Sequence, residues 1–360
     1  MYSEEVIVLL GAGASCDAGL ASSFEMTRML EESLKPDGEL AAFSDLYKAV
    51  KSAIIYGHNL AADPGSSVSA ELNIEELVNV LNELVQCKNH VIYPFIASWN
   101  MELIEYAGRN FKKVKDFKDA IIGNLVSEWI NLKNDEDASY YKGLYDFACS
   151  CASSLRVFSL NYDMCVECGC GTKSVYRGFE PDCDGVKVWD DRNMQTVKVK
   201  EPITLYKLHG SMDWCRDQKG RLCYNDHVNV RQNPDKFELI FGTSNKMRYE
   251  DPYLYLLSAF RKYALEAKLI VCIGYSFNDS HINKILEQAG RRNAPFLLSA
   301  SAPSDKPNAS KEERKELVRR LKFDGSKVEC FPVGARKFMT EILNGDLITR
   351  YVPDGANVPF

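Results

Sequence analysis

Four short clusters in the chain carry the residue types that bind ligands or move protons: Gly11-Ala12-Gly13-Ala14-Ser15, Asn161-Tyr162-Asp163, His209-Gly210-Ser211 and Gly274-Tyr275-Ser276. In the first cluster, Gly11 and Gly13 let the backbone turn tightly and approach a pyrophosphate. The amides at the start of a following helix would point at that anion. The usual dinucleotide fingerprint has a third glycine, but Cys16 stands at that place and the next glycine is Gly19. A tight strand-to-helix turn without a ligand therefore stays open as an alternative.

Each cluster follows a short apolar run of the kind that forms a buried strand. These runs are residues 6–10, 154–160, 203–208 and 269–273, and further runs lie at 237–241, 296–298 and 327–331. Helical stretches lie between the runs, and Ser310 with Glu313 predicts a capping box. Strands alternating with helices predict an α/β fold with a Rossmann-like, mostly parallel sheet and helices on both faces. Because ligands of such sheets bind beyond the carboxyl ends of the strands, we expect the four clusters to share one pocket.

A long segment interrupts this alternation of strands and helices. Apolar residues recur at helical spacing from Leu72 to Leu84, and further helical patterns run through 93–106 and 117–132. We therefore expect a large helical insertion at 33–150. It would divide the Rossmann-like domain into residues 1–32 and 151–345, and a C-terminal tail would follow at 346–360.

The composition is that of an ordinary globular protein, with 46% hydrophobic and 26% charged residues among 360. A net charge of -6 argues against direct nucleic-acid binding. No apolar run approaches the roughly 18–20 residues of a membrane span. The acidic N-terminus runs directly into the first strand and glycine turn, so we expect no signal peptide and a cytoplasmic location.

The chain has 12 cysteines, and in a reducing compartment we expect no disulfides among them. Cys165, Cys168, Cys170 and Cys183 lie close enough in sequence to be considered as zinc ligands. A zinc site needs thiolates that converge in a tetrahedron. The first two cysteines fall on an expected helix after Asp163, where apolar residues would serve equally well. We therefore expect no metal, with zinc at these four residues as the alternative.

Taken in order, the clusters resemble the sirtuin family, and specifically its divergent bacterial branch of NAD-consuming enzymes. The turn at 11–15 with Ala18-Gly19-Leu20 is similar to the family's first NAD-binding loop, and 160–163 is similar to its Asn–Asp motif. Residues 208–210 resemble the histidine motif, and 274–279 resemble the late Gly-x-Ser motif on the adenosine side. Phe241-Gly242-Thr243 is similar to a further segment. The resemblance spans residues 6 to about 285.

This resemblance implies that NAD is the substrate and that the clusters have separate roles. His209 would be the catalytic base, a role that histidine side chains commonly fill at neutral pH, and Asn161 would orient the ribose or a water. The cofactor-binding residues would be Gly11, Ala12, Gly13, Ala14, Ser15, Gly19, Leu20, Asp163, Gly274, Ser276 and Asp279. Read without the family, His209 is equally explained as a hydrogen-bonded structural residue, and Asn161 and Asp163 as caps of the next helix.

The expected reaction is hydrolysis of NAD to nicotinamide and ADP-ribose. Nicotinamide leaves as a neutral molecule, so no general acid is needed, and the charge develops on an oxocarbenium-like ribose. Deacylating sirtuins carry a zinc module of two Cys-x-x-Cys pairs after the histidine, whereas here only Cys215 and Cys223 follow before Cys272. The alternatives are an NAD-dependent protein deacylase or ADP-ribosyltransferase, and a non-catalytic module that senses a nucleotide.

The helical insertion is similar to that of family members that destroy NAD during phage infection. Since uncontrolled NAD loss kills the host, we expect an anti-phage effector that is regulated by assembly or by a partner. The resemblance implies a homo-oligomer and a companion such as a HerA-type ATPase or an Argonaute-related protein.

Overall fold

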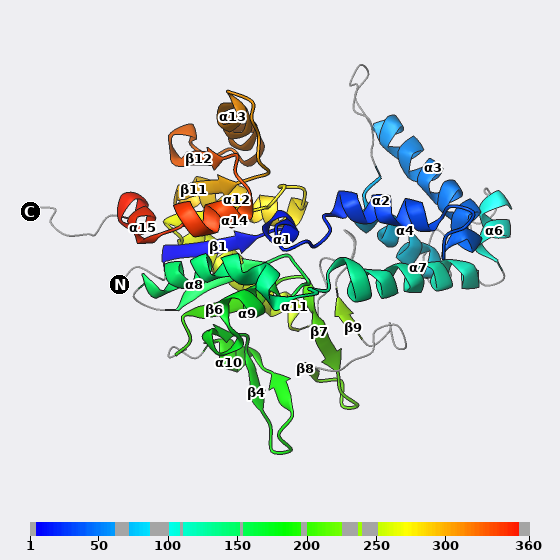
Figure 1. The fold of residues 1–360 in the computed structure, drawn as a ribbon, viewed down its shortest axis with the longest axis horizontal. Helices are drawn as coiled ribbons and strands as arrows, with labels where there is room; N and C mark the ends of the chain where they lie inside the picture. Colours follow the sequence, from blue (N-terminus) through cyan, green and yellow to red (C-terminus); the bar gives the residue numbers. More distant parts are fainter. Residues whose placement is uncertain are drawn as a thin grey trace, which may run out of the picture. The chain divides into compact units, whose positions relative to one another are not determined.

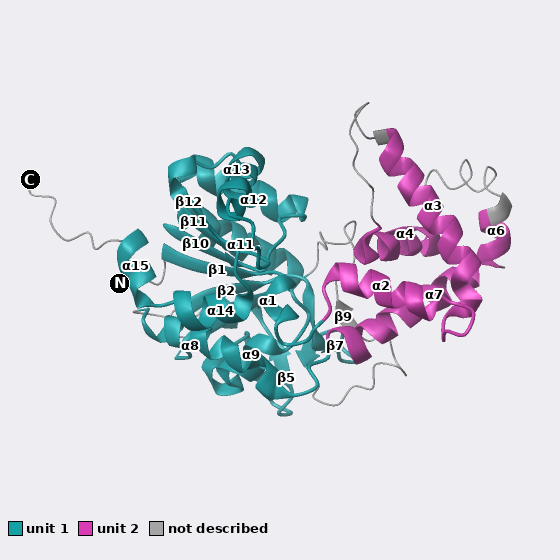
Figure 2. Cartoon of the chain, turned by 45° about the horizontal axis from the view of Figure 1, so that its top comes forward, with its two compact units in different colours: residues 1–20, 131–227, 247–360 teal, residues 21–130, 228–246 magenta. Residues whose placement is uncertain are grey.

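The computed structural model describes residues 5–61, 72–86, 101–108, 111–151, 154–195, 200–224, 237–239 and 251–352. The chain divides into two compact units (Figure 2): unit 1 is 1–20, 131–227 and 247–360, and unit 2 is 21–130 and 228–246. These boundaries differ from the predicted insertion at 33–150. Residues 21–32 fall in unit 2, and residues 131–150 fall in unit 1.

Unit 1 is built on a seven-stranded sheet whose order is β12-β11-β10-β1-β2-β6-β3 (Figure 1). Every strand pair in it is parallel. The strands are β1 (Val6–Leu10), β2 (Leu155–Ser159), β3 (Val175–Tyr176), β6 (Ile203–Lys207), β10 (Leu269–Ile273), β11 (Phe296–Ala300) and β12 (Val328–Phe331). The spatial strand order β6-β2-β1-β10-β11-β12 is that of a dinucleotide-binding Rossmann sheet, which confirms the predicted fold class.

Helices cover both faces of this sheet. On one face, Val6, Val8 and Leu10 pack in a core with residues of η6 (Asp135–Tyr141), α8 (Lys142–Cys149) and η11 (Phe338–Ile342). On the other face, Phe158 stacks on Tyr206 and meets Phe260 of α11 (Tyr253–Glu266) edge-on. All five residues of β1 are buried, and a fully buried Val, Leu or Ile contributes about 1.5–3 kcal/mol.

Unit 1 contains further helices and a second, small sheet. The helices are α1 (Gly13–Cys16), α9 (Cys165–Cys170), α10 (Asp191–Gln195), α12 (Ser280–Arg292), α13 (Ala309–Leu321), α14 (Ala335–Lys337) and α15 (Gly345–Tyr351), with single turns at η7 (Thr172–Ser174) and η10 (Gly325–Lys327). A small antiparallel sheet joins β4 (Phe179–Pro181), β5 (Lys187–Trp189), β8 (Leu222–Tyr224) and β7 (Gly210–Arg216).

Unit 2 is mainly helical in the residues that are described. It contains α2 (Ser23–Ser33), η2 (Ala41–Phe43), α3 (Ser44–Ala61), α4 (Ile74–Gln86), α6 (Met101–Ala107), α7 (Lys112–Asn124) and η5 (Leu125–Trp129). Leu77, Val78 and Leu81 of α4 are fully buried. Their spacing is the helical pattern seen in the sequence, and they form core as expected. None of the described helices combines the length and hydropathy needed to cross a membrane.

Two local predictions are wrong. The run at 237–241 contains a strand, β9 (Phe237–Leu239), but this strand is not part of the parallel sheet. The predicted capping box at Ser310 is absent, because α13 begins at Ala309 after the N-cap Asn308. Ser310 donates instead to the carbonyl of Cys330, and Glu313 accepts from two serines of the neighbouring strand end, Ser299 and Ser301.

Candidate functional site

The four clusters lie at the carboxyl ends of four consecutive strands of the sheet, β10, β1, β2 and β6. Because these strands are parallel neighbours, their ends form one edge, as the sequence predicts. The chain runs from β1 toward β2 and β6 on one side and returns through β10, β11 and β12 on the other. The boundary between β1 and β10 is therefore the topological switch point, where open α/β sheets bind ligands.

Backbone contact between the loops after β1 and β10 explains the glycines of the first and last clusters. Gly11 N–H donates to Ile273 O at 3.0 Å, and Gly13 N–H donates to Gly274 O at 2.9 Å. A Cβ atom on Gly11 would lie 2.6 Å from Gly274 O, and one on Gly274 would lie 2.0 Å from Ala14 N. Gly274 also has a φ of +63°, which favours glycine.

The expectation for the amides of this turn needs correction. The helix after the turn, α1, has only four residues. The amides of Ala14 and Ser15 donate to Gly11 O and Ala12 O, and Gly19 N–H closes the turn on Cys16 O. The amide protons of Gly13, Ala14 and Ser15 are therefore already hydrogen-bonded to backbone carbonyls. The long helix that follows, α2, begins at Ser23 in unit 2 with its own capping box from Ser22 and Glu25.

Asn161 connects the end of β2 to the glycine turn. Its Nδ2 donates to Gly11 O at 2.9 Å and to Ser15 Oγ at 3.1 Å, and its side chain is buried, with 7% of the residue exposed. Because a carbonyl oxygen can only accept, these bonds fix which end of the amide faces the turn. Asn161 is thus not a helix cap, since α9 begins four residues later.

Asp163 is not the N-cap of α9, which is Met164, but its carboxylate contacts the start of that helix. Its Oδ1 accepts from the amide of Cys165, the first residue of α9, at 2.9 Å, and the residue is buried. This contact accounts for the carboxylate locally, whatever else it binds. Leu20 is buried in the unit 1 core, whereas Ser276 is exposed just after β10.

His209 faces a carboxylate that the sequence did not pair with it. Its Nε2 lies 3.5 Å from Asp279 Oδ2, and only 6% of His209 is exposed. Asp279 is the N-cap of α12, where its Oδ1 accepts from the amides of His281 and Ile282. One carboxylate therefore caps a helix and lies beside an imidazole. The ring of Tyr162, next to Asn161 in the chain, lies 6.3 Å from the His209 ring centroid.

Two neighbouring tyrosines hold the glycine turn from η6. Tyr141 Oη lies 3.1 Å from Ser15 Oγ, and Tyr140 donates its hydroxyl to Ala14 O at 2.6 Å. Burial raises the pKa of both hydroxyls, so they stay protonated. No motif in the sequence singled out these tyrosines, because an adjacent aromatic pair is equally typical of a core.

A family model for the SIR2-like domain matches residues 156–321. Residues 156–321 are therefore similar to a SIR2-like domain. The matched segment contains Asn161, Asp163, His209, Gly274, Ser276 and Asp279. The glycine turn at 11–15 precedes it in sequence but joins it through the bonds to Asn161 and Gly274.

Solved structures that resemble the chain include Sir2 proteins. A Sir2 homolog–NAD complex is 10% identical, covers 95% of this chain and 90% of its own, and has a TM-score of 0.43. Sir2Tm bound to a propionylated peptide is 11% identical, with coverages of 96% and 92% and a TM-score of 0.36. A search of the curated proteins finds no match.

The cysteines of unit 1 do not form a metal centre in the part of the chain that the structure describes. No group of three or more His, Cys, Asp or Glu side chains there is placed to hold a metal ion. Burial raises the pKa of Cys165 strongly, and raises those of Cys168 and Cys170 to about 12. The Cys170 thiol donates to Tyr141 O, and Cys183 is exposed.

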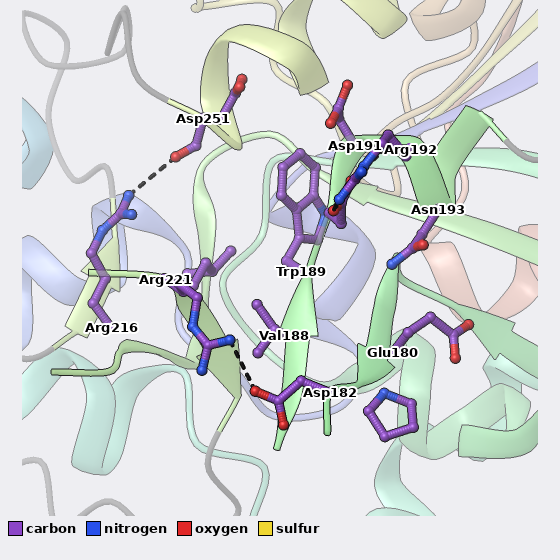
Figure 3. A pocket seen from close by; sticks show the side chains of 13 residues that line it. Glu180, Asp182, Val188, Trp189, Asp191, Arg192, Asn193, Arg216, Arg221 and Asp251 are labelled. Atoms are coloured by element: carbon purple, nitrogen blue, oxygen red, sulfur yellow. Dashed lines mark hydrogen bonds and ion pairs between the residues drawn. The ribbon is translucent and has the colours of Figure 1, made fainter. Parts of the chain in front are cut away.

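A hollow of about 630 Å³ lies on the small sheet of unit 1 rather than among the predicted site residues (Figure 3). Its arginines have partners within the protein: Arg221 Nη1 lies 2.9 Å from Asp182 Oδ2, and Arg216 donates to the backbone carbonyl of Asp251. None of the catalytic or cofactor-binding residues proposed from the sequence lines it. We therefore assign the candidate site to the strand ends.

Proposed function

We propose that the SIR2-like domain binds NAD at the carboxyl ends of β10, β1, β2 and β6 and hydrolyses it to nicotinamide and ADP-ribose. The observation that carries this proposal is the placement of Asn161 and His209 at neighbouring strand ends, each with its own buried partner. Asn161 is bonded to Gly11, and His209 faces Asp279. The match to the SIR2-like family over this segment supports NAD as the substrate class.

Cleavage of NAD does not require a general acid, because the leaving nicotinamide is neutral. The bond between ribose C1′ and the pyridinium nitrogen breaks, and its electron pair leaves with neutral nicotinamide. A water oxygen bonds to C1′, and His209 takes one of its protons directly or through a ribose hydroxyl. A positioned base of this kind contributes about 10²–10⁴ in rate. Asp279 would orient the imidazole and stabilise it once protonated.

Asn161 would act through its carbonyl oxygen. Both protons of its amide nitrogen go to the glycine turn, to Gly11 O and Ser15 Oγ. The group that it can offer a ribose hydroxyl or the attacking water is therefore Oδ1. Asp163 would accept from the nicotinamide carboxamide. The turn at 11–15 with Gly19 and Leu20 would lie along the pyrophosphate, and Gly274 and Ser276 would contact the adenosine ribose.

The direct test is an NAD consumption assay on the full chain. Nicotinamide and ADP-ribose are followed by chromatography for the wild type, His209→Ala and Asn161→Ala, and NAD binding is measured by calorimetry. Equimolar nicotinamide and ADP-ribose from the wild type alone would support the proposal. Binding without product would favour a nucleotide-sensing module. Acyl-ADP-ribose or ADP-ribosylated protein would favour the deacylase or transferase alternatives.

We further propose that this activity is a regulated effector of anti-phage defence, acting by NAD depletion in the cytoplasm of a bacterial cell. His209 and Asn161 are nearly buried, so control would act through movement of groups that limit access to them. Self-assembly, a HerA-type ATPase or an Argonaute-related partner would cause that movement. The test is phage challenge of cells with the chain and its genomic neighbours: cellular NAD should fall on infection, and His209→Ala should prevent the fall.

A further inference from the structure

A buried lysine lies directly beneath the candidate site. Lys207 is the last residue of β6, a strand with no exposed residue, and only 1% of its surface is exposed. Burying an ammonium group is costly unless its charge is balanced and its three protons are bonded. The contacts of Lys207 therefore indicate what the residue does.

Those contacts reach the two segments that carry Asn161 and His209. Lys207 Nζ donates to the carbonyl of Asp163 and lies 3.5 Å from the carbonyl of Tyr162, both just after Asn161. It also lies 3.1 Å from Ser211 Oγ, two residues after His209. One ammonium group thus joins the loop after β2 to the turn after β6.

Backbone bonds run between the same two segments. Leu208 N–H donates to Ser159 O at 2.9 Å, and Met212 N–H donates to Tyr162 O at 3.0 Å. Lys207 directly precedes the donor of the first bond in the chain, and its ammonium group lies 3.5 Å from Tyr162 O, the acceptor of the second. Loss of the Lys207 ammonium group should therefore weaken the hydrogen bonds of both amides, those of Leu208 and Met212.

The charge of Lys207 belongs to a buried set of four ionic side chains. Its Nζ lies 3.4 Å from Glu167 Oε1, and Arg177 Nη1 lies 3.3 Å from the same oxygen and 2.7 Å from Asp213 Oδ2. Two cations and two carboxylates leave this set neutral. Removing Lys207 alone would leave an uncompensated carboxylate, which destabilises any protein. A useful test has to separate that effect from positioning.

We propose that Lys207 is a positioning residue, whose ammonium group fixes the loop at 161–163 against the turn at 209–211 and so sets Asn161 and His209 in register for catalysis. The catalytic consequence rests on the proposed function, whereas the structural tie does not. No ligand contact is assigned to Lys207 itself.

The experiment compares Lys207→Met with the double variant Lys207→Met/Glu167→Gln, which removes one charge of each sign. We expect the double variant to recover most of the thermal stability lost in Lys207→Met, while kcat for NAD cleavage stays at least tenfold below wild type and KM changes less than threefold. Recovery of kcat in the double variant would overturn the proposal, because Lys207 would then serve only to neutralise Glu167.

A second readout does not depend on activity. Hydrogen exchange of the amides of Leu208 and Met212 should be at least tenfold faster in the double variant, and faster to a smaller degree in Ser211→Ala, which keeps every charge. The control is Lys327→Met, which removes a partly buried lysine that donates to Ala294 O elsewhere in unit 1.

These outcomes separate the two proposals. If the double variant exchanges faster but the wild type does not cleave NAD, the proposed reaction is wrong and the structural role of Lys207 stands. Unchanged exchange at both amides in the double variant and in Ser211→Ala would refute the tie, whatever the activity.

Discussion

The side-chain amide of Asn161 donates to the carbonyl oxygen of Gly11 at 2.9 Å, across 150 residues of sequence. This bond joins the ends of β2 and β1 at the place where the candidate site is built. The fold therefore uses the nitrogen end of this amide to hold the turn, and the proposed reaction would use its oxygen end.

Asn161→Ala should abolish NAD cleavage and lower the free energy of unfolding by about 1–3 kcal/mol, because it removes a donor from two buried acceptors. Urea denaturation and the nicotinamide assay measure the two effects. Asn293→Ala is the matched control, since Asn293 Nδ2 also donates to two backbone carbonyls, those of Ala267 and Glu266. It should lose stability but keep turnover; equal loss of turnover in both variants would argue against a catalytic role for Asn161.

Asp279→Ser should separate the two functions of this carboxylate. Serine is as good an N-cap as aspartate, so α12 should remain stable, but the partner of His209 is lost. We expect kcat to fall at least tenfold with little change in melting temperature. Asp279→Ala should lose a further ~0.5–2 kcal/mol of stability through the missing cap. Full activity of Asp279→Ser would show that His209 works without this carboxylate.

Gly274→Ala should be among the most damaging single substitutions in unit 1. Its Cβ would lie 2.0 Å from the backbone nitrogen of Ala14, and its φ of +63° adds about 1–2 kcal/mol of strain. We expect loss of folded protein on expression, or a strongly lowered unfolding midpoint. Gly57→Ala in α3 is the control, because a Cβ there meets nothing within 4 Å and alanine favours a helix interior by about 0.8–1.0 kcal/mol. A folded, stable Gly274→Ala would mean that the two loops separate readily.

Acid should weaken unit 1 through Asp213. Burial opposes ionisation of this carboxyl, but Arg177 and Lys207 outweigh it and hold the pKa of Asp213 below its ordinary value. A group with a depressed folded-state pKa stabilises the protein above its unfolded pKa, near 3.9, and this contribution is lost as the pH falls through the folded value.

Arg177→Met should therefore lower the melting temperature at pH 7 and move the acid midpoint to higher pH, as measured by thermal melts between pH 3 and 7. Arg319→Met breaks an exposed ion pair with Glu316. It should change the melting temperature by no more than about a degree and the acid midpoint by no more than a few tenths of a pH unit. An unchanged acid midpoint in Arg177→Met would contradict the assignment.

The cysteines should react with iodoacetamide in an order set by burial. Cys149 and Cys183 are exposed and should be labelled first at pH 8. Cys215 should react slowly, since burial raises its pKa to about 12 and only the thiolate is nucleophilic. Mass spectrometry of tryptic peptides over time gives the order. Stoichiometric zinc in the purified protein, with Cys165, Cys168, Cys170 and Cys183 all protected, would instead favour the zinc alternative.

The sheet was predictable because its strands are short apolar runs and the clusters follow them directly. The apolar runs Val6–Leu10 and Leu269–Ile273 predict buried parallel strands, and the glycines that follow each run predict the turns. The pairing of His209 with Asp279 was not predictable, because it depends on the direction of two side chains from distant strand ends. Phe241-Gly242-Thr243, the remaining segment of the resemblance, lies outside the described residues.

Local patterns failed where a tertiary partner was stronger. Ser310 and Glu313 have the spacing of a capping box, yet both side chains bond to groups on β11 and β12 or their ends. Lys207 carried a signal that was overlooked, namely a lone lysine closing an apolar strand. Tyr140 and Tyr141 carried none, since their hydroxyls find the glycine turn only once the fold has formed.

The central place of β1 has a consequence for biosynthesis. This strand is made before both of its neighbours in the sheet, and one of them, β10, spans Leu269–Ile273. At about 5–20 residues per second, the ribosome leaves β1 with an unpaired edge for many seconds before β10 is synthesised. The nascent chain therefore holds an exposed apolar edge, and the candidate site cannot form until β10 and the loop after it have been synthesised. For a protein proposed to destroy NAD, this delay keeps every unfinished copy inactive.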